Sequence, residues 1–156
     1  MYTVSALYHF TSFDDPAALR EPLLNLCQSQ GIRGTILLAQ EGINGTVAGT
    51  AGAMQKLWAH IDALPGCKGF DHKESTAQSM PFKKMKVRLK REIVTMGVQG
   101  VKPAEGTGHY VDPADWNELI SAPDVAVIDT RNDYEIGIGT FQGAIDPQTK
   151  TFREFP

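Results

Sequence analysis

Residues 34–49 read Gly-Thr-Ile-Leu-Leu-Ala-Gln-Glu-Gly-Ile-Asn-Gly-Thr-Val-Ala-Gly, an apolar run that enters a Gly- and Asn-rich stretch and leaves it as a second run. Strand-forming residues on both sides of an Asn-Gly pair are typical of a β-hairpin, because both residues of the pair tolerate positive φ. We therefore predict a strand over 32–39, a turn over 40–45 that uses Asn44 and Gly45, and a returning strand that starts at Thr46.

The segments around this hairpin alternate between strand and helix patterns. Residues 2–10 mix β-branched, aromatic and small side chains, residues 16–29 repeat leucine at helical spacing, and an amphipathic helix is predicted after Thr50. Further strands are predicted over 69–75 and 84–94. The order β-α-β-β-α-β, with one additional candidate strand, is that of the ferredoxin-like α+β fold. Such a sheet carries both helices on one face and leaves the other face open to a partner.

Charge divides the chain into two bodies. Of its 156 residues, those through Met96 include 11 Lys and Arg against 8 Asp and Glu, whereas those from Gly97 onward include 4 against 10. Between the bodies lies a Gly-rich stretch that Pro103 interrupts, which is typical of a linker. We predict three parts: a domain over 1–96, a linker over 97–109 and a second body over 110–156.

Several function classes are disfavoured by composition. No stretch is apolar for long enough to span a bilayer and the N-terminus lacks a leader pattern, so we expect a cytoplasmic protein with no membrane partner. The two cysteines, Cys27 and Cys67, have no metal-type spacing, and the four histidines are scattered. We expect no metal site, and we expect Cys27, which sits among leucines, to be buried and inert.

The last candidate strand carries a row of cations. At the strand period of two, Lys84, Lys86, Arg88 and Lys90 project to one side, and the residues between them, Met85, Val87 and Leu89, are predicted to enter the core. Cations about 7 Å apart match the spacing of phosphates along a nucleic-acid strand. The alternative is an edge strand guarded by lysines against aggregation. Four aromatic side chains are candidates either for stacking on bases or for the core: Tyr8, Phe70, His72 and Phe82.

Two polar residues in the hairpin are also candidates for contact with a substrate. Glu41 and Asn44 offer side-chain oxygens and an amide beside glycines, which favours a small site for substrate contact. The alternative is that the turn is purely architectural.

The second body opens with a helix signal and a short strand. Asp112 is a capping residue with Pro113 at the first helical position, and residues 125–131 form an apolar strand that ends in a polar cluster. Chemistry gathers at the carboxyl ends of strands in open α/β sheets, which makes Asp129, Arg131 and Glu135 candidates. An ion-pair network that fixes a loop is the alternative.

Taken together, these stretches resemble one family. Residues 34–49, 81–97 and 110–116 look like the rhodanese-related tRNA uridine hydroxylases, and residues 127–145 resemble the opening of a rhodanese domain. The resemblance implies an acylphosphatase-like domain of ferredoxin-like fold over 1–96, followed by an incomplete α/β rhodanese-like segment over 110–156. It further implies an oxidoreductase that hydroxylates the wobble uridine at carbon 5, with molecular oxygen as co-substrate, no other cofactor, the tRNA anticodon region as partner and no role for DNA.

The chain departs from that family at one point. The family's rhodanese cysteine sits in a loop of the type Cys-Thr-Gly-Gly-Ile-Arg-Cys, which this sequence lacks, so we expect the nucleophile beyond Pro156 and an inactive fragment without its C-terminal rhodanese portion. For a tRNA enzyme, the basic row is favoured as an RNA contact. Two alternatives remain: a stand-alone acyl-phosphate hydrolase, although no arginine follows the first strand, and a sulfur carrier or sulfurtransferase that uses Cys67.

Overall fold

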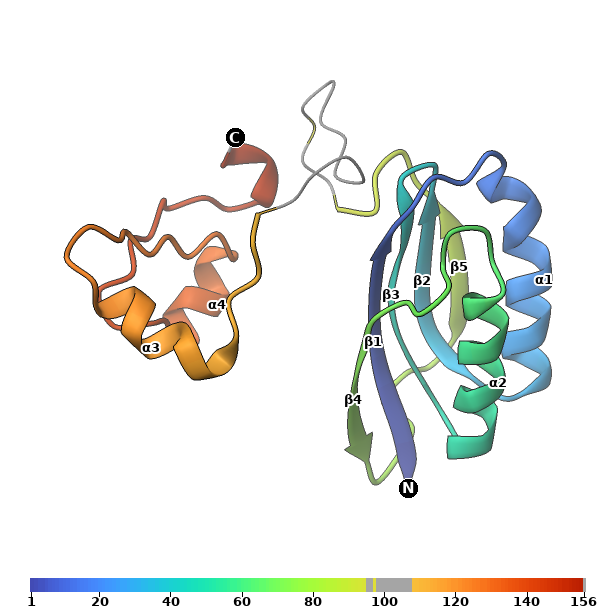
Figure 1. Cartoon of the computed structure of the whole chain (residues 1–156). Helices are drawn as coiled ribbons and strands as arrows, with labels where there is room; N and C mark the ends of the chain where they lie inside the picture. The colour runs from blue at the N-terminus through green and yellow to red at the C-terminus, as the bar shows by residue number, and fades with distance from the viewer. Residues whose placement is uncertain (95–96, 98–107, 156) are drawn as a thin grey trace. The chain divides into compact units, whose positions relative to one another are not determined.

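The computed structural model describes residues 1–94, 97 and 108–155, which fall into two compact units, one over 1–94 and one that contains 108–155. The elements of the first unit follow the chain in this order (Figure 1): β1 (Tyr2–Phe10), α1 (Pro16–Ser29), β2 (Arg33–Ala39), β3 (Gly42–Gly49), α2 (Ala51–Asp62), β4 (His72–Ala77) and β5 (Met85–Leu89).

The strands of the first unit form one sheet in the order β4-β1-β3-β2-β5. The pairs among β4, β1, β3 and β2 are antiparallel, and β5 adds to the outer side of β2 as a parallel strand. Both helices lie on the same side of the sheet (Figure 1). This confirms the predicted βαββαβ order, the additional strand and the α+β class. In the part of this unit that the structure describes, the other sheet face carries no helix.

Local signals account for the helices. Asp15 caps α1, since its side chain accepts hydrogen bonds from the backbone N–H groups of Ala17 and Ala18 at 3.0 and 3.1 Å, and Pro16 follows at the first helical position. Thr50 caps α2 through the N–H of Ala53 at 3.3 Å. The helices cover the core against the sheet, and its largest fully buried side chains include Leu7, Leu23, Ile36, Leu38, Ile43, Met54, Leu57 and Ile61.

The predicted position of the hairpin turn is wrong. Ala39 pairs with Gly42, so Gln40 and Glu41 form the loop, and Asn44 and Gly45 lie inside β3. Gly45 is needed there for close packing rather than for a turn. A Cβ at Gly45 would overlap the carbonyl oxygen of Thr35 in β2 and come within 2.9 Å of Ile36 Cα. The Asn-Gly pair therefore marks a tight approach between strands.

This close approach predicts the effect of a single methyl group. Gly45→Ala is expected to destabilise the first unit by about 1–3 kcal/mol, because backbone atoms of β2 must move to admit the Cβ. Gly52→Ala is the matched control, since a Cβ on that α2 residue meets nothing within 4 Å, and it is expected to stabilise by about 0.5–1 kcal/mol. Urea unfolding followed by Trp58 fluorescence measures both changes. Equal stabilities for the two variants would contradict the packing explanation.

The last two strands of this unit differ from prediction at their ends. β5 stops at Leu89, which is 43% exposed and so does not enter the core as predicted, although Val87 does. Leu89 still pairs with Leu38, and the N–H of Lys90 donates to the carbonyl of Leu38 at 2.9 Å, but Leu89 is the last residue of an edge strand. β4 starts at His72 instead of residue 69, because the N–H of Phe70 turns back to the carbonyl of Cys67.

The second unit contains α3 (Pro113–Ser121), α4 (Asp133–Ile138) and the 3-10 turn η2 (Phe152–Glu154). The predicted cap of α3 is confirmed, since Asp112 accepts the N–H of Ala114 at 2.9 Å. The predicted strand over 125–131 is wrong: a single parallel bridge joins Ile128 to Ile145, and within 108–155 the structure shows no ladder that would extend it. Among the described residues, every buried hydrophobic side chain lies in the first unit.

The predicted domain boundaries stay predictions, because most of the predicted linker over 97–109 lies outside the described residues. No helix in the part of the chain that the structure describes is both long and apolar enough to cross a bilayer.

Candidate nucleic-acid interface

The register of β2 and β5 decides which side chains lie on the open sheet face. Ile36 pairs with Val87, and both point toward the helices, being 0% and 3% exposed. Alternation then places their neighbours on the opposite face, where Thr35 pairs with Lys86 and Leu37 pairs with Arg88. Both cations are exposed. The strand therefore presents positive charge on the face without helices, as the sequence pattern predicts.

The other two cations of the row flank the strand. The carbonyl of Lys84 accepts the N–H of Gly34 at 3.0 Å, and the N–H of Lys90 donates to Leu38, so each residue is held against an end of the β2 ladder. Both side chains are exposed. Since β5 is an edge strand, its lysines also suit the alternative of an edge protected against aggregation.

A hollow opens beside the first cations of the row. It has a volume of about 340 Å³ and is lined by Gly34, Thr35, Phe82, Lys83, Lys84 and Lys86. A second hollow of about 440 Å³ shares Lys83 and Lys84 and adds Arg33 and Gln28 to its lining. Two neighbouring depressions thus have the same pair of lysines on their walls.

The four candidate aromatic residues separate into two groups. Phe70 is buried, and it stacks on His72 at 5.2 Å, which in turn stacks on Trp58 of α2 at 4.6 Å, so this group belongs to the helix side of the sheet. Tyr8 alternates with the core residue Leu7 and lies on the open face, where its ring meets Phe10 edge to face at 4.9 Å. Phe82 is half-buried and lines the smaller hollow.

Glu41 and Asn44 converge on one backbone segment. The N–H of Ile93 donates to Oε1 of Glu41 at 2.6 Å, and Nδ2 of Asn44 donates to the carbonyl of Ile93 at 2.8 Å. Ile93 is 2% exposed, so its backbone groups depend on these two side chains in place of water. The structure thus gives both residues an architectural role, and their contact with a substrate stays a prediction.

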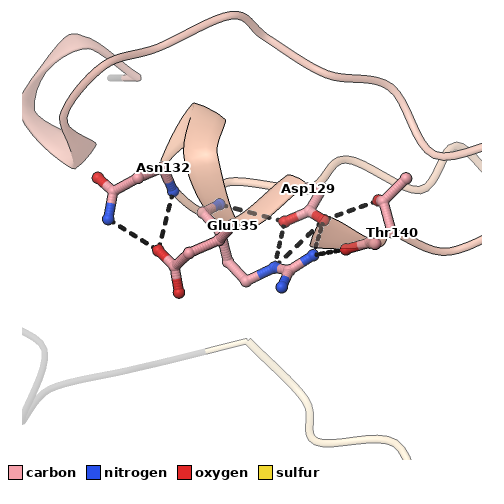
Figure 2. Close-up of polar contacts among 6 residues, drawn as sticks. Asp129, Asn132, Glu135 and Thr140 are labelled. Carbon is pink, nitrogen blue, oxygen red and sulfur yellow. Dashed lines mark hydrogen bonds and ion pairs between the residues drawn. The ribbon is translucent and has the colours of Figure 1, made fainter. Parts of the chain in front are cut away.

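The polar cluster of the second unit is an ion-pair network (Figure 2). Arg131 donates from Nε to Oδ1 of Asp129 at 2.9 Å and from Nη2 to its Oδ2 at 2.6 Å, and Thr140 adds a third donor at 2.8 Å. Nη2 also reaches the carbonyl of Gly139 at 2.7 Å. The third predicted residue, Glu135, accepts hydrogen bonds from the backbone and side chain of Asn132 instead and so closes the first turn of α4.

The network has an electrostatic signature. Hydrogen bonds from Arg131 and Thr140 hold the pKa of Asp129 well below its usual range, and the hydrogen bond to Asp129 raises the pKa of Arg131. A carboxyl whose pKa is lower in the folded state contributes stability above its unfolded pKa of about 4 and loses that contribution as the pH falls below it.

We therefore expect the second unit to lose stability as the pH falls below about 4, and Asp129→Asn to flatten that dependence. The side-chain indole signal of Trp116 in NMR spectra reports on this unit. Asp124→Asn, at an exposed position of the same unit, is the control and is expected to keep the wild-type acid transition. An unchanged transition in the Asp129 variant would remove the network as its cause.

Neither cysteine has the properties of a nucleophile. Cys27 and Cys67 are both fully buried, and burial raises the pKa of their thiols to about 12 and about 11, respectively. The prediction for Cys27 is confirmed. The sulfur-carrier alternative, which depends on an exposed Cys67, is wrong, because the turn from Leu64 to Phe70 packs that side chain into the core.

The acyl-phosphate alternative has no anion site after β1. Residues 11–15 there read Thr-Ser-Phe-Asp-Asp, and Asp15 occupies the N–H groups at the start of α1. A carboxylate in that position repels a phosphate. Across residues 1–94, 97 and 108–155, no three His, Cys, Asp or Glu side chains are grouped so that they hold a metal ion.

Comparisons with known proteins show the family of this chain. A family model described as the UPF0176 acylphosphatase like domain matches residues 2–93. The chain belongs to this family. A protein of Gluconobacter oxydans named tRNA uridine(34) hydroxylase is 63% identical over 153 residues, which are 98% of this chain and 49% of that protein. A protein of Roseobacter denitrificans with the same name is 60% identical over 156 residues, which are 100% of this chain and 53% of that protein. The chain thus spans about half the length of the curated relatives it matches.

Solved structures show weaker similarity. An acylphosphatase from Coxiella burnetii is 11% identical with a TM-score of 0.42, and the match covers 56% of this chain and 90% of that one. The BLUF protein BlrB is 21% identical with a TM-score of 0.40, over 62% of this chain and 76% of that one. Similarity at this level does not bear on activity.

Proposed function

We propose that this chain is the RNA-engaging N-terminal part of a tRNA uridine(34) hydroxylase. The observation that carries the proposal is identity of 60–63% along essentially the whole chain to proteins of that name. The parent enzyme hydroxylates the wobble uridine at carbon 5 with molecular oxygen, acts in the cytoplasm and binds the anticodon region of its tRNA.

In this proposal the open face of the first unit binds the RNA backbone. Lys86 and Arg88 stand on that face, and Lys84 and Lys90 extend the row at both ends of β5. Cations about 7 Å apart along a strand neutralise successive phosphates. An edge strand is suited to this role because, among the described residues, no further strand pairs with its outer side, although Arg20 of α1 donates to the carbonyl of Val87 at 3.1 Å.

The second unit, in the same proposal, is the beginning of a rhodanese-like domain that also needs the remainder of the parent. Its exposed apolar side chains support this, since Ile128, Ile138, Phe141 and Ile145 are each about half exposed or more. The nucleophilic thiol is supplied by that remainder, because Cys27 and Cys67 are buried.

A salt titration of tRNA binding to the 156-residue chain tests the proposal. Each phosphate that a cation neutralises contributes a slope of about −0.7 to −0.9 to the dependence of log affinity on log salt concentration. Four contacts give a slope of roughly −3, so the affinity falls by about 100-fold between about 50 and 250 mM salt. Absence of binding at low salt, or an affinity that salt does not change, contradicts the proposal.

A further inference from the structure

The smaller hollow at the edge of the sheet combines two chemistries that a nucleotide needs. Phe82 supplies an aromatic ring to its lining, and Lys83, Lys84 and Lys86 supply positive charge. Thr35 adds a hydroxyl, and Gly34 leaves the wall without a side chain. Its volume of about 340 Å³ lies within the range of about 300–1,000 Å³ that is usual for small-molecule sites.

We propose that this hollow binds one unstacked nucleotide of a single-stranded RNA, with its base on Phe82 and its phosphates on the three lysines. The proposal rests on the proposed function and adds the location at which a base leaves the stack. Base-on-aromatic stacking requires an unpaired base, because in a duplex both faces of the base are covered.

Charge around the hollow favours RNA over a free nucleotide. Lys83 and Lys84 also line the second hollow, where Arg33 stands, and Arg88 and Lys90 continue the row along the other direction. Cations therefore lead away from the hollow on both sides. A mononucleotide has phosphates for only one of these groups, whereas a strand that runs through the hollow engages both.

The test compares three probes: a five-nucleotide oligouridine, an RNA duplex and uridine monophosphate. Phe82→Leu keeps apolar bulk and removes the ring. It is expected to weaken binding of the oligouridine by about 5- to 150-fold and to change duplex binding by less than about twofold. In the unmutated chain, NMR spectra are expected to show upfield shifts of the uracil H5 and H6 protons of the oligouridine, a ring-current effect that needs no variant.

Several outcomes overturn this assignment and separate it from the proposed function. If Phe82→Leu binds the oligouridine like wild type while the double variant K86E/R88E binds weakly, the nucleotide site is wrong and RNA binding by the row stands. If the unmutated chain binds no RNA probe, both fail. Uridine monophosphate that binds as tightly as the oligouridine shows a free-nucleotide site instead. The NMR spectrum of the Phe82 variant, with Trp58 as reporter of the first unit, verifies that the variant is folded.

Discussion

The double variant K86E/R88E is expected to bind tRNA roughly 100-fold more weakly than the unmutated chain at about 50 mM salt. The two side chains project from neighbouring positions of one strand face, so a single RNA strand meets both. A hydrogen bond to a charged group contributes about 1.5–3 kcal/mol, and loss of two such bonds removes about 3 kcal/mol or more. Glutamate adds repulsion to this loss, and the salt slope is expected to become less negative by about 1.4 to 1.8. Filter binding or fluorescence anisotropy at several salt concentrations measures both quantities.

A matched control separates position from total charge. K56E/K68E changes the net charge of the chain by the same amount, but Lys56 is on α2 and Lys68 is in the loop that follows it, so neither belongs to the sheet. This control is expected to weaken binding by less than about threefold, a long-range effect that salt screens. If the two double variants weaken binding equally, the row on β5 has no specific role in RNA binding. The interpretation of β5 as an edge strand whose lysines protect it against aggregation then gains support.

The sequence predicted best where the signals were local. The start of α1 follows from Asp15 and Pro16, which cap it and set its first turn, and its end follows from Gly31, which has a φ of +68°. The alternation of β5 likewise placed Lys86 and Arg88 on the correct face, because side-chain period depends on the strand alone.

Contacts between distant residues explain what the sequence did not predict. Asn44-Gly45 has the composition of a turn, yet its conformation is set by strand β2 and by Ile93, which lies 49 residues beyond Asn44. Leu89 follows the core alternation of its strand and pairs with Leu38, but it is the last residue of an edge strand and stays exposed. Cys67 follows a Pro-Gly pair that is typical of an exposed loop, whereas tertiary packing buries it.

In the candidate site, too, the sequence predicted some features and missed others. The basic row could be predicted from its spacing, but the hollow could not, because it forms where Phe82 and Lys83 meet Gly34 and Thr35 from a separate strand. For Asp129 and Arg131, the structure shows a bidentate pair. The signal that distinguishes an ion pair from a reactive carboxylate is this geometry, which only the fold supplies.

Removal of the two side chains that hold Ile93 is expected to destabilise the first unit strongly. Glu41→Ala leaves the buried N–H of Ile93 without an acceptor, which costs about 2–3 kcal/mol. Asn44→Ala leaves the carbonyl of Ile93 without a donor, which costs about 1–2 kcal/mol. Both bonds fix one peptide segment, so the double variant is expected to lose less than the two single losses combined. Urea unfolding followed by Trp58 fluorescence measures each step of this cycle.

Conservative variants distinguish a structural clamp from a substrate contact at the same positions. Glu41→Gln keeps an oxygen acceptor for the N–H of Ile93 and is expected to lose about 1 kcal/mol or less, because the bond loses only its charge. Thr46→Ala, at an exposed position of β3, is the control and is expected to stay within about 0.5 kcal/mol of the unmutated chain. If Glu41→Gln keeps its stability and its tRNA affinity, the pair acts through Ile93 alone. If it keeps its stability but loses tRNA binding, Glu41 touches the RNA, since a clamp that still holds Ile93 has no other way to weaken binding.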